Sequence, residues 1–335
     1  MTNSNSSNSP YILEMRNVSK TFPGVKALDQ INLRVKRGSV HALMGENGAG
    51  KSTLMKILYG IYIPDEGGEL ILDDKPFKPG RPIDAIRRGL TMVPQEISPA
   101  ANLTIADNFY LGREITKGKF FLNQKAMNEQ ASAILKELGV PMDVTEKMSD
   151  VSVAKAQLVA IATAVSNDAK VIIMDEPTTA LTENEVDQLY RIIETVKARG
   201  IAIIFISHKL DEVFRVSDEI TVIRDGQYVD TKPTKEVTKE QLISMMVGRD
   251  MSEMFQRERF ELSDEIVLEI KHFTREGKYQ DINFAVRKGE IFGIAGLVGA
   301  GRSEIVEGLF GYKPADSGEI YIKGEKAIIN NPLDA

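Results

Sequence analysis

Residues 45–52 read Gly-Glu-Asn-Gly-Ala-Gly-Lys-Ser, and they are the segment of this chain whose residue types and spacing point most directly to chemistry. The glycines let the backbone turn with its N–H groups pointing inward, and a helix that begins here adds a partial positive charge. The pattern predicts a polyphosphate-binding loop in which Lys51 reaches the β- and γ-phosphates and the Ser52 hydroxyl ligates Mg²⁺. The alternative is a glycine-rich turn that binds nothing.

The segments on either side of this loop favour the binding interpretation. Residues 39–44 form an apolar-rich run of strand length, and residues 53–59 carry apolar side chains at helical spacing. A strand, a glycine-rich loop and a helix in that order are the context in which this pattern binds phosphate.

Two acidic residues follow a second apolar strand. Residues 170–174 read Lys-Val-Ile-Ile-Met and precede Asp175 and Glu176. At the tip of a buried parallel strand, Asp175 would hold the Mg²⁺ shell through water and Glu176 would orient or deprotonate an attacking water. The alternative is that these acids cap a helix opened by Pro177.

Three further residues lie where such a site could use them. The strand over residues 91–96 leads to Gln95, and the strand over residues 201–206 is followed by His208. Parallel-sheet geometry would carry His208 to the same edge as Glu176, although a structural histidine is the alternative. Phe22 lies in a turn with Pro23 and Gly24, where it could stack on an adenine ring or close a small β-core.

The elements that must position these residues alternate between strands and helices. We expect strands over residues 11–15, 31–35 and 70–72, and helices over 81–90, 123–138 and 154–165. Asn123 is a plausible N-cap, and Gly139 is a plausible stop for the helix between them. A hairpin at Asp225-Gly226 and a helix over 239–246 follow.

Composition narrows the class of protein. A chain of 335 residues exceeds the usual size of one domain, and 42% hydrophobic residues suffice for a full core. With 48 acidic and 42 basic residues, the net charge of −6 does not suggest a protein that holds nucleic acid by bulk charge. The chain contains no cysteine, which excludes disulfides and thiolate metal sites. No apolar run approaches the ~20 residues that span a bilayer, and residues 1–10 are expected to be a disordered leader.

Together these residues resemble the nucleotide-binding subunits of ABC transporters over the whole chain after the leader. The resemblance implies an α/β P-loop NTPase fold with a parallel core sheet, an antiparallel β-subdomain and a helical subdomain. It implies ATP and Mg²⁺ as cofactors. The implied nucleotide-binding residues are Phe22, Gly45, Glu46, Asn47, Gly48, Ala49, Gly50, Lys51, Ser52, Thr53 and Ser152. The implied catalytic residues are Lys51, Gln95, Glu176 and His208, and the implied metal ligands are Ser52, Gln95 and Asp175.

Two motifs depart from the family pattern. The family usually has Leu-Ser-Gly-Gly-Gln as its signature, whereas residues 151–155 read Val-Ser-Val-Ala-Lys, so only Ser152 is carried over. Residues 179–182 read Thr-Ala-Leu-Thr and lack the aspartate that the family usually has in its D-loop.

The chain also repeats itself. Residues 296–303 repeat the phosphate loop, with Arg302 in place of lysine, and Gly296 lies 251 residues after Gly45. Residues 266–270 echo residues 11–15. We expect a first ABC ATPase domain over 11–250, a linker over 251–265, and the truncated start of a second domain over 266–335.

The degenerate signature and Arg302 resemble one group within the family, the ATP-binding subunits of bacterial monosaccharide importers for ribose, galactose/methyl galactoside, arabinose and xylose. Residues 22–28 and 245–249 also resemble that group. The resemblance implies an ATPase at the cytoplasmic face of the membrane that binds permease subunits and no nucleic acid. It implies an indirect partnership with a periplasmic or lipid-anchored sugar-binding protein, and a second ABC half outside this chain. A purine-nucleoside importer, a soluble non-transport ABC ATPase and a scaffold that binds ATP without hydrolysis are the alternatives.

Overall fold

The computed structural model describes residues 9–118, 121–166, 168–248, 263–297 and 299–335. The chain divides into two compact units, Met1–Phe255 and Gln256–Ala335. Most of the expected leader and all but the last three residues of the expected linker lie outside the described residues.

The centre of the first unit is a run of parallel strands. In the order β6 (Leu90–Val93), β9 (Val171–Asp175), β10 (Ala202–Ile206), β3 (Val40–Met44) and β11 (Glu219–Arg224), each strand pairs in parallel with the next. Every residue of β3 and β10 is buried. Because helices or other strands cover both faces of this sheet, its strands need continuous apolar runs, as the sequence predicts.

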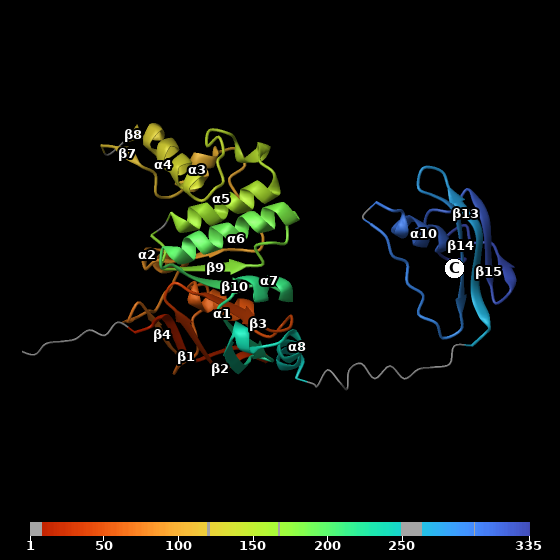
Figure 1. The fold of residues 1–335 in the computed structure, drawn as a ribbon, viewed down its shortest axis with the longest axis horizontal. Coiled ribbons are helices and arrows are strands. Elements are labelled where there is room, and N and C mark those ends of the chain that lie inside the picture. The colour runs from red at the N-terminus through yellow and green to blue at the C-terminus, as the bar shows by residue number, and fades with distance from the viewer. Residues whose placement is uncertain (1–8, 119–120, 167, 249–262, 298) are drawn as a thin grey trace, which may run out of the picture. The chain divides into compact units, whose positions relative to one another are not determined.

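Antiparallel strands extend the same sheet on one side. A long hairpin of β1 (Tyr11–Phe22) and β2 (Val25–Lys36) is joined by β4 (Glu69–Leu72), β5 (Lys75–Pro76) and β12 (Gln227–Pro233). The helix α1 (Lys51–Leu58) lies between this layer and the parallel strands, and its buried side chains join residues of both in one core (Figure 1).

Helices cover the opposite face of the parallel strands. They are α5 (Val153–Val165) and α6 (Glu183–Ala198), and α3 (Ile105–Phe109) and α4 (Gln124–Glu137) pack on α5 farther from the sheet (Figure 1). The four helices share a second core with β6, β9 and β10. The expected caps of α4 are confirmed, because the Asn123 side chain accepts a hydrogen bond from the Ala126 N–H at 3.3 Å and Gly139 has φ +73°. Pro177 opens no helix, since α6 begins after Thr182, where Glu185 completes a capping box.

Shorter elements complete the first unit. Their bounds are α2 (Pro82–Arg87), β7 (Thr116–Lys117), β8 (Phe121–Leu122), the 3₁₀ turns Met148–Asp150 and Thr234–Glu236, α7 (Leu210–Val216) and α8 (Lys239–Val247). The short strands β7 and β8 pair with each other between α3 and α4.

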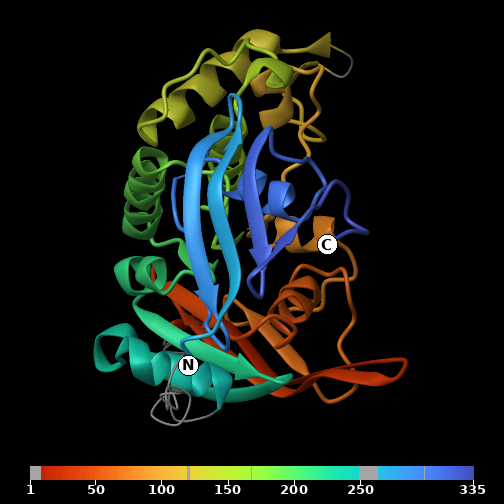
Figure 2. The same ribbon diagram turned by 90° about the vertical axis from the view of Figure 1, so that its right-hand side faces the viewer.

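In its described residues, the second unit is a four-stranded antiparallel sheet with one helix. Its strands lie in the order β14 (Tyr279–Arg287), β13 (Ile266–Arg275), β15 (Ser317–Ile322) and β16 (Glu325–Ala327). The helix α10 (Arg302–Leu309) runs along one face of this sheet, and its Ile305 packs against Ile270 and Phe273 (Figure 2).

Backbone contacts of the first unit recur in the second. The Asn32 side chain accepts from the Asn17 N–H at 3.1 Å, and the Asn283 side chain accepts from the His272 N–H at 2.7 Å. Both donor residues, Asn17 and His272, have positive φ, at 51° and 52°. The phosphate-loop turn repeats as well, with Ala49 N–H bonded to Glu46 O and Ala300 N–H bonded to Leu297 O, each at 3.1 Å.

The second unit lacks a strand equivalent to β3 in its described residues. Residues 291–295 correspond in position to β3 but are not paired as a strand, and Ile291 and Leu297 are 99% and 86% exposed. In the first unit β3 is held between β10 and β11. The described part of the second unit contains no counterpart of those two strands, so this apolar segment has no neighbour to pair with.

Candidate functional site

The phosphate-type loop connects β3 to α1, and packing explains two of its glycines. A Cβ at Gly45 would lie 2.2 Å from the Ile223 carbonyl oxygen, and one at Gly50 would lie 2.6 Å from Leu28 Cδ2. Gly50 also has φ +102°, a region that favours glycine. Gly48 has φ +87° but open space around its missing Cβ. The loop is therefore pressed against neighbouring strands at both ends and open in the middle.

The open side of the loop forms the wall of a cavity of ≈ 290 Å³. Sheet register explains why distant segments meet there, because Ile206 of β10 is paired with Asp175 of β9 and Val93 of β6 with Met174. The carboxyl ends of these parallel strands therefore lie at one edge. The cavity is lined by Ala27, Asn47, Gly48, Gly50, Lys51, Ser52, Thr53, Gln95, Asp175, Glu176 and Ile206.

Glu176 is the centre of a polar cluster at this edge. Its Oε1 lies 3.1 Å from His208 Nδ1, and its Oε2 accepts a hydrogen bond from Gln95 Nε2 at 3.1 Å. Glu176 has φ +47°, and its N–H donates to the Ile206 carbonyl at 2.9 Å. A glutamate in the left-handed region is strained by about 1–3 kcal/mol, and such strain is concentrated at functional sites.

Lys51 and Asp175 contribute opposite charges to the cavity. Lys51 Nζ donates to the carbonyls of Gly45 at 2.6 Å and Glu46 at 2.9 Å. Burial lowers the pKa of the Lys51 ammonium, an effect that Asp175 and Glu176 oppose. Burial and the neighbouring Glu176 raise the pKa of the Asp175 carboxyl. The cavity thus holds a half-buried ammonium, bonded to backbone carbonyls, and two neighbouring carboxylates.

Not every residue expected at the site lies in its wall. His208 reaches the cluster through Glu176, whereas Phe22 packs edge-on against Tyr62 with ring centroids 5.2 Å apart. Ser152 is the exposed N-cap of α5, where its Oγ accepts from the Lys155 N–H at 3.3 Å. Neither Phe22 nor Ser152 lines the cavity, and Gly45, Glu46 and Ala49 belong to the loop but are not among the lining residues.

Sequence reasoning missed two parts of this site. Ala27 lines the cavity, and its carbonyl would lie 2.7 Å from a Cβ at Gly226. The Gly226 N–H also donates to Ala49 O at 3.2 Å, so the β11–β12 turn supports the loop from behind. The Asp225-Gly226 turn is visible in the sequence, but its distance from the loop along the chain hides the contact.

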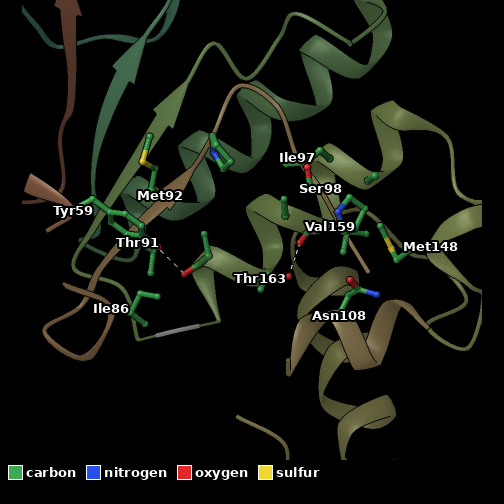
Figure 3. A pocket seen from close by; sticks show the side chains of 15 residues that line it. Tyr59, Ile86, Thr91, Met92, Ile97, Ser98, Asn108, Met148, Val159 and Thr163 are labelled. Carbon is green, nitrogen blue, oxygen red and sulfur yellow. Dashed lines mark hydrogen bonds between the residues drawn. The ribbon is translucent and has the colours of Figure 1, made fainter. Parts of the chain in front are cut away.

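A second cavity of ≈ 250 Å³ lies between β6 and the helices of the first unit. Figure 3 shows Tyr59, Ile86 and Met92 on one side of it and Asn108, Met148 and Val159 on the other. Ile97 and Ser98, which follow Gln95 closely, line it as well. The segment after β6 therefore joins both cavities.

Among the described residues, none of the helices combines the length and the apolar character that crossing a bilayer would require. The same residues include no cluster of three or more histidine, aspartate or glutamate side chains placed to hold a metal ion.

The fold and the loop define an ATP-binding cassette. Residues 28–179 match the family model described as ABC transporter. An ATP-binding cassette of an ABC transporter, solved in its ADP conformation, is 26% identical with a TM-score of 0.62 and covers 74% of this chain and 99% of its own. A nucleotide-free cassette is 27% identical with a TM-score of 0.60, over 72% of this chain and 96% of its own. The expected P-loop ABC ATPase fold is therefore confirmed.

Curated relatives agree with the group that the sequence resembles. The galactose/methyl galactoside import ATP-binding protein MglA of Fusobacterium nucleatum is 47% identical over 98% of this chain and 65% of its own length. A Geobacillus kaustophilus protein, provisionally named for ribose/galactose/methyl galactoside import ATP binding, is 48% identical over 97% of this chain and 64% of its own. The chain thus spans about two thirds or slightly less of the relatives it matches.

Proposed function

We propose that this chain is the ATP-binding and ATP-hydrolysing part of a subunit that powers import of a monosaccharide through a membrane permease. ATP hydrolysis is supported by one observation. Glu176 contacts both His208 and Gln95 at the edge of the cavity whose wall includes the phosphate-type loop. The names of the relatives support the transport part.

ATP would bind with its phosphates against residues 45–53. Lys51 is the residue whose contacts must change, because its ammonium now donates to the Gly45 and Glu46 carbonyls. Phosphate oxygens carry negative charge, so they are stronger acceptors for this ammonium than the neutral carbonyl oxygens. Polyphosphate would also place negative charge next to the half-buried Lys51 ammonium. We place Phe22 beside the adenine and Ser152 at a nucleotide held by another domain, as the family resemblance implies.

The donor set of the cavity fits Mg²⁺. The Ser52 hydroxyl, the Asp175 carboxylate and the Gln95 amide oxygen all belong to its wall. One carboxylate with neutral oxygens suits Mg²⁺, which keeps several waters and shares its shell with phosphates. When bound, the ion would neutralise phosphate charge.

For hydrolysis, Glu176 would accept a proton from the attacking water. His208 Nδ1 and Gln95 Nε2 hold its two carboxylate oxygens, so the side chain is oriented before substrate arrives. A general base positioned in this way contributes about 10²–10⁴-fold to the rate.

We place the permease contact at the second cavity and along residues 97–111. This segment follows Gln95 directly, and the exposed Leu103 and Leu111 lie in it. The proposal puts the subunit at the cytoplasmic face of the membrane and brings in a periplasmic or lipid-anchored sugar-binding protein only indirectly.

We further propose that residues 11–250 form a first ABC ATPase domain, residues 251–265 a linker, and residues 266–335 the start of a second domain. The repeated bulge at Asn17 and His272 supports the duplication. So does the repeated turn at Ala49 and Ala300. The relatives' greater length leaves room for the rest of the second domain. A purine-nucleoside importer shares this layout, but the relatives' names favour a sugar.

Two variants separate binding from hydrolysis. Lys51→Ala removes the phosphate contact, so calorimetry with Mg-ATP should detect little binding. Glu176→Gln keeps the shape and removes the base, so ATP should still bind while turnover of the full-length protein falls ~10²–10⁴-fold. Exposed Lys125→Ala is the control and should behave as wild type. Unchanged turnover in Glu176→Gln would refute the assignment of the base.

Transport is tested in cells. Uptake of labelled galactose, ribose and a purine nucleoside is compared between the parent strain, a strain without this gene and the same strain complemented with Glu176→Gln. We expect loss of sugar uptake in the last two. A loss confined to uptake of the nucleoside would show that the substrate is a nucleoside. Cross-linking from residues 97–111 tests the permease contact, and a failure to capture any membrane protein would show that the docking site lies elsewhere.

A further inference from the structure

A buried carboxylate joins the two loops that carry Glu176 and His208. Glu212 lies in the first turn of α7 and is 7% exposed. Its Oε2 accepts hydrogen bonds from Thr178 Oγ1 at 2.9 Å and from Ser207 Oγ at 2.8 Å. Thr178 is two residues after Glu176, and Ser207 directly precedes His208, so one oxygen atom ties both loops together.

The remaining polar atoms around Glu212 are accounted for. Lys209 Nζ lies 3.1 Å from Glu212 Oε1, which gives the buried charge a cation. The Ser207 oxygen also accepts from the Lys209 N–H at 3.1 Å. Thr178 and Ser207 are 2% and 4% exposed, so water does not compete for their hydroxyls. A buried carboxylate is stable only when its lone pairs are satisfied, and here each donor comes from a loop next to the site.

Two other contacts join the same loops. The Glu176 N–H donates to Ile206 O, and Lys209 Nζ lies 3.4 Å from Thr178 Oγ1. His208 itself is 60% exposed, and its Nδ1 contacts Glu176. The strained φ of Glu176 must be maintained by its surroundings. The Glu212 carboxylate can maintain this conformation through Thr178 and Ser207, and it does not line the cavity.

We propose that Glu212 is a positioning residue that holds Glu176 and His208 in register for the attack on ATP. This inference rests on the proposed hydrolysis at Glu176. It predicts that Glu212 acts on the chemical step and leaves nucleotide binding alone, because Thr178, Ser207 and Glu212 are not among the residues that line the cavity.

The test compares turnover of the full-length protein with and without this tie. Glu212→Ala should lower kcat about 10- to 100-fold, the loss expected when a reacting group is misplaced by about 1 Å, while KM for ATP stays within about twofold. Asp211→Ala is the matched control, because it removes an exposed carboxylate from the same helix and should leave kcat unchanged. In a His208→Ala background, Glu212→Ala should cost no more than about twofold further, since both changes break one unit.

A rise in KM equal to the fall in kcat, or additive losses in the double variant, would overturn the proposal, because both indicate general damage. If Glu212→Ala does not fold, Thr178→Val removes one of the two hydroxyls at nearly constant shape, and an unchanged kcat there would also overturn it.

Hydrogen exchange separates this inference from the proposed function. In Glu212→Ala the amides of residues 175–179 and 206–209 should exchange faster than in wild type, with residues 40–44 unchanged. This holds whether or not the protein hydrolyses ATP, so an inactive wild type would refute hydrolysis alone. Unchanged exchange at both loops would refute the role of Glu212.

Discussion

Gly45 and Gly48 lie three residues apart in the same loop, yet the structure predicts that alanine at each position damages a different property. A Cβ at Gly45 would lie 2.2 Å from the Ile223 carbonyl oxygen, which belongs to the rigid strand β11. A Cβ at Gly48 would meet no atom within 4 Å and would point into the space where the phosphates are proposed to bind.

The magnitudes follow from these surroundings. Gly48→Ala carries the penalty of a positive φ, about 1–2 kcal/mol. Gly45→Ala adds the cost of overpacking, typically 1–3 kcal/mol, so its total is about 2–5 kcal/mol. Each kcal/mol lowers the melting temperature of a domain of this size by roughly 2–4 °C. Gly45→Ala should therefore lower the transition of the first unit about twice as far as Gly48→Ala.

Nucleotide affinity should follow the opposite order. Calorimetry with Mg-ATP, at a temperature where both variants are folded, should show Gly48→Ala weaker than wild type by at least about tenfold, or 1.4 kcal/mol. Gly45→Ala should retain more affinity. If both variants lose affinity and stability in the same proportion, the loop does not divide packing from binding in the way its geometry indicates.

Two further predictions concern stability. Hydrogen bonds from Lys170 and then Arg37 lower the pKa of Asp73 to about 2, so this carboxylate stabilises the fold above its unfolded pKa near 4, and the contribution is lost as pH falls toward 2. In urea at pH 7, Asp73→Asn should therefore be less stable than wild type, and the difference should shrink between about pH 4 and pH 2. A difference that stays constant with pH would contradict the ion pairs. Thr182→Ala removes the capping box that starts α6 and should cost about 1 kcal/mol in the same assay, whereas an unchanged midpoint would show that tertiary packing alone fixes the start of this helix.

The sequence predicts the elements around the site because their signals are local. Glycine spacing, apolar runs and the Asn123 cap each operate within a few residues, and the structure bears them out. The order of the strands depends on long-range pairing, so the contact between the Asp225-Gly226 turn and the loop could not be predicted. The same limit hides Glu212, whose partners Thr178 and Ser207 lie on two different loops.

An apolar sequence pattern also fails to predict a strand where the segment requires a neighbouring strand to pair with. Residues 291–295 are as apolar as those of β3, yet they form no strand, because strand formation in a parallel sheet is a property of the pairing. Phe22 illustrates a related point. The sequence places it in a turn, whereas it is the last residue of β1 and pairs with Val25, and its contact with Tyr62 depends on the segment after α1.

The place of β3 in the sheet has a consequence for synthesis of the chain. Val40–Met44 pairs with Ala202–Ile206 and Glu219–Arg224, which a ribosome adds some 160 to 180 residues later. At about 5–20 residues per second, that interval lasts on the order of 10–40 s. For that time a strand that is fully buried in the folded protein is outside the ribosome or entering its exit path with neither partner made. Over the same interval α1 and the β1–β2 hairpin are already available, and their packing against one face of Val40–Met44 would shield it from other chains until the sheet closes.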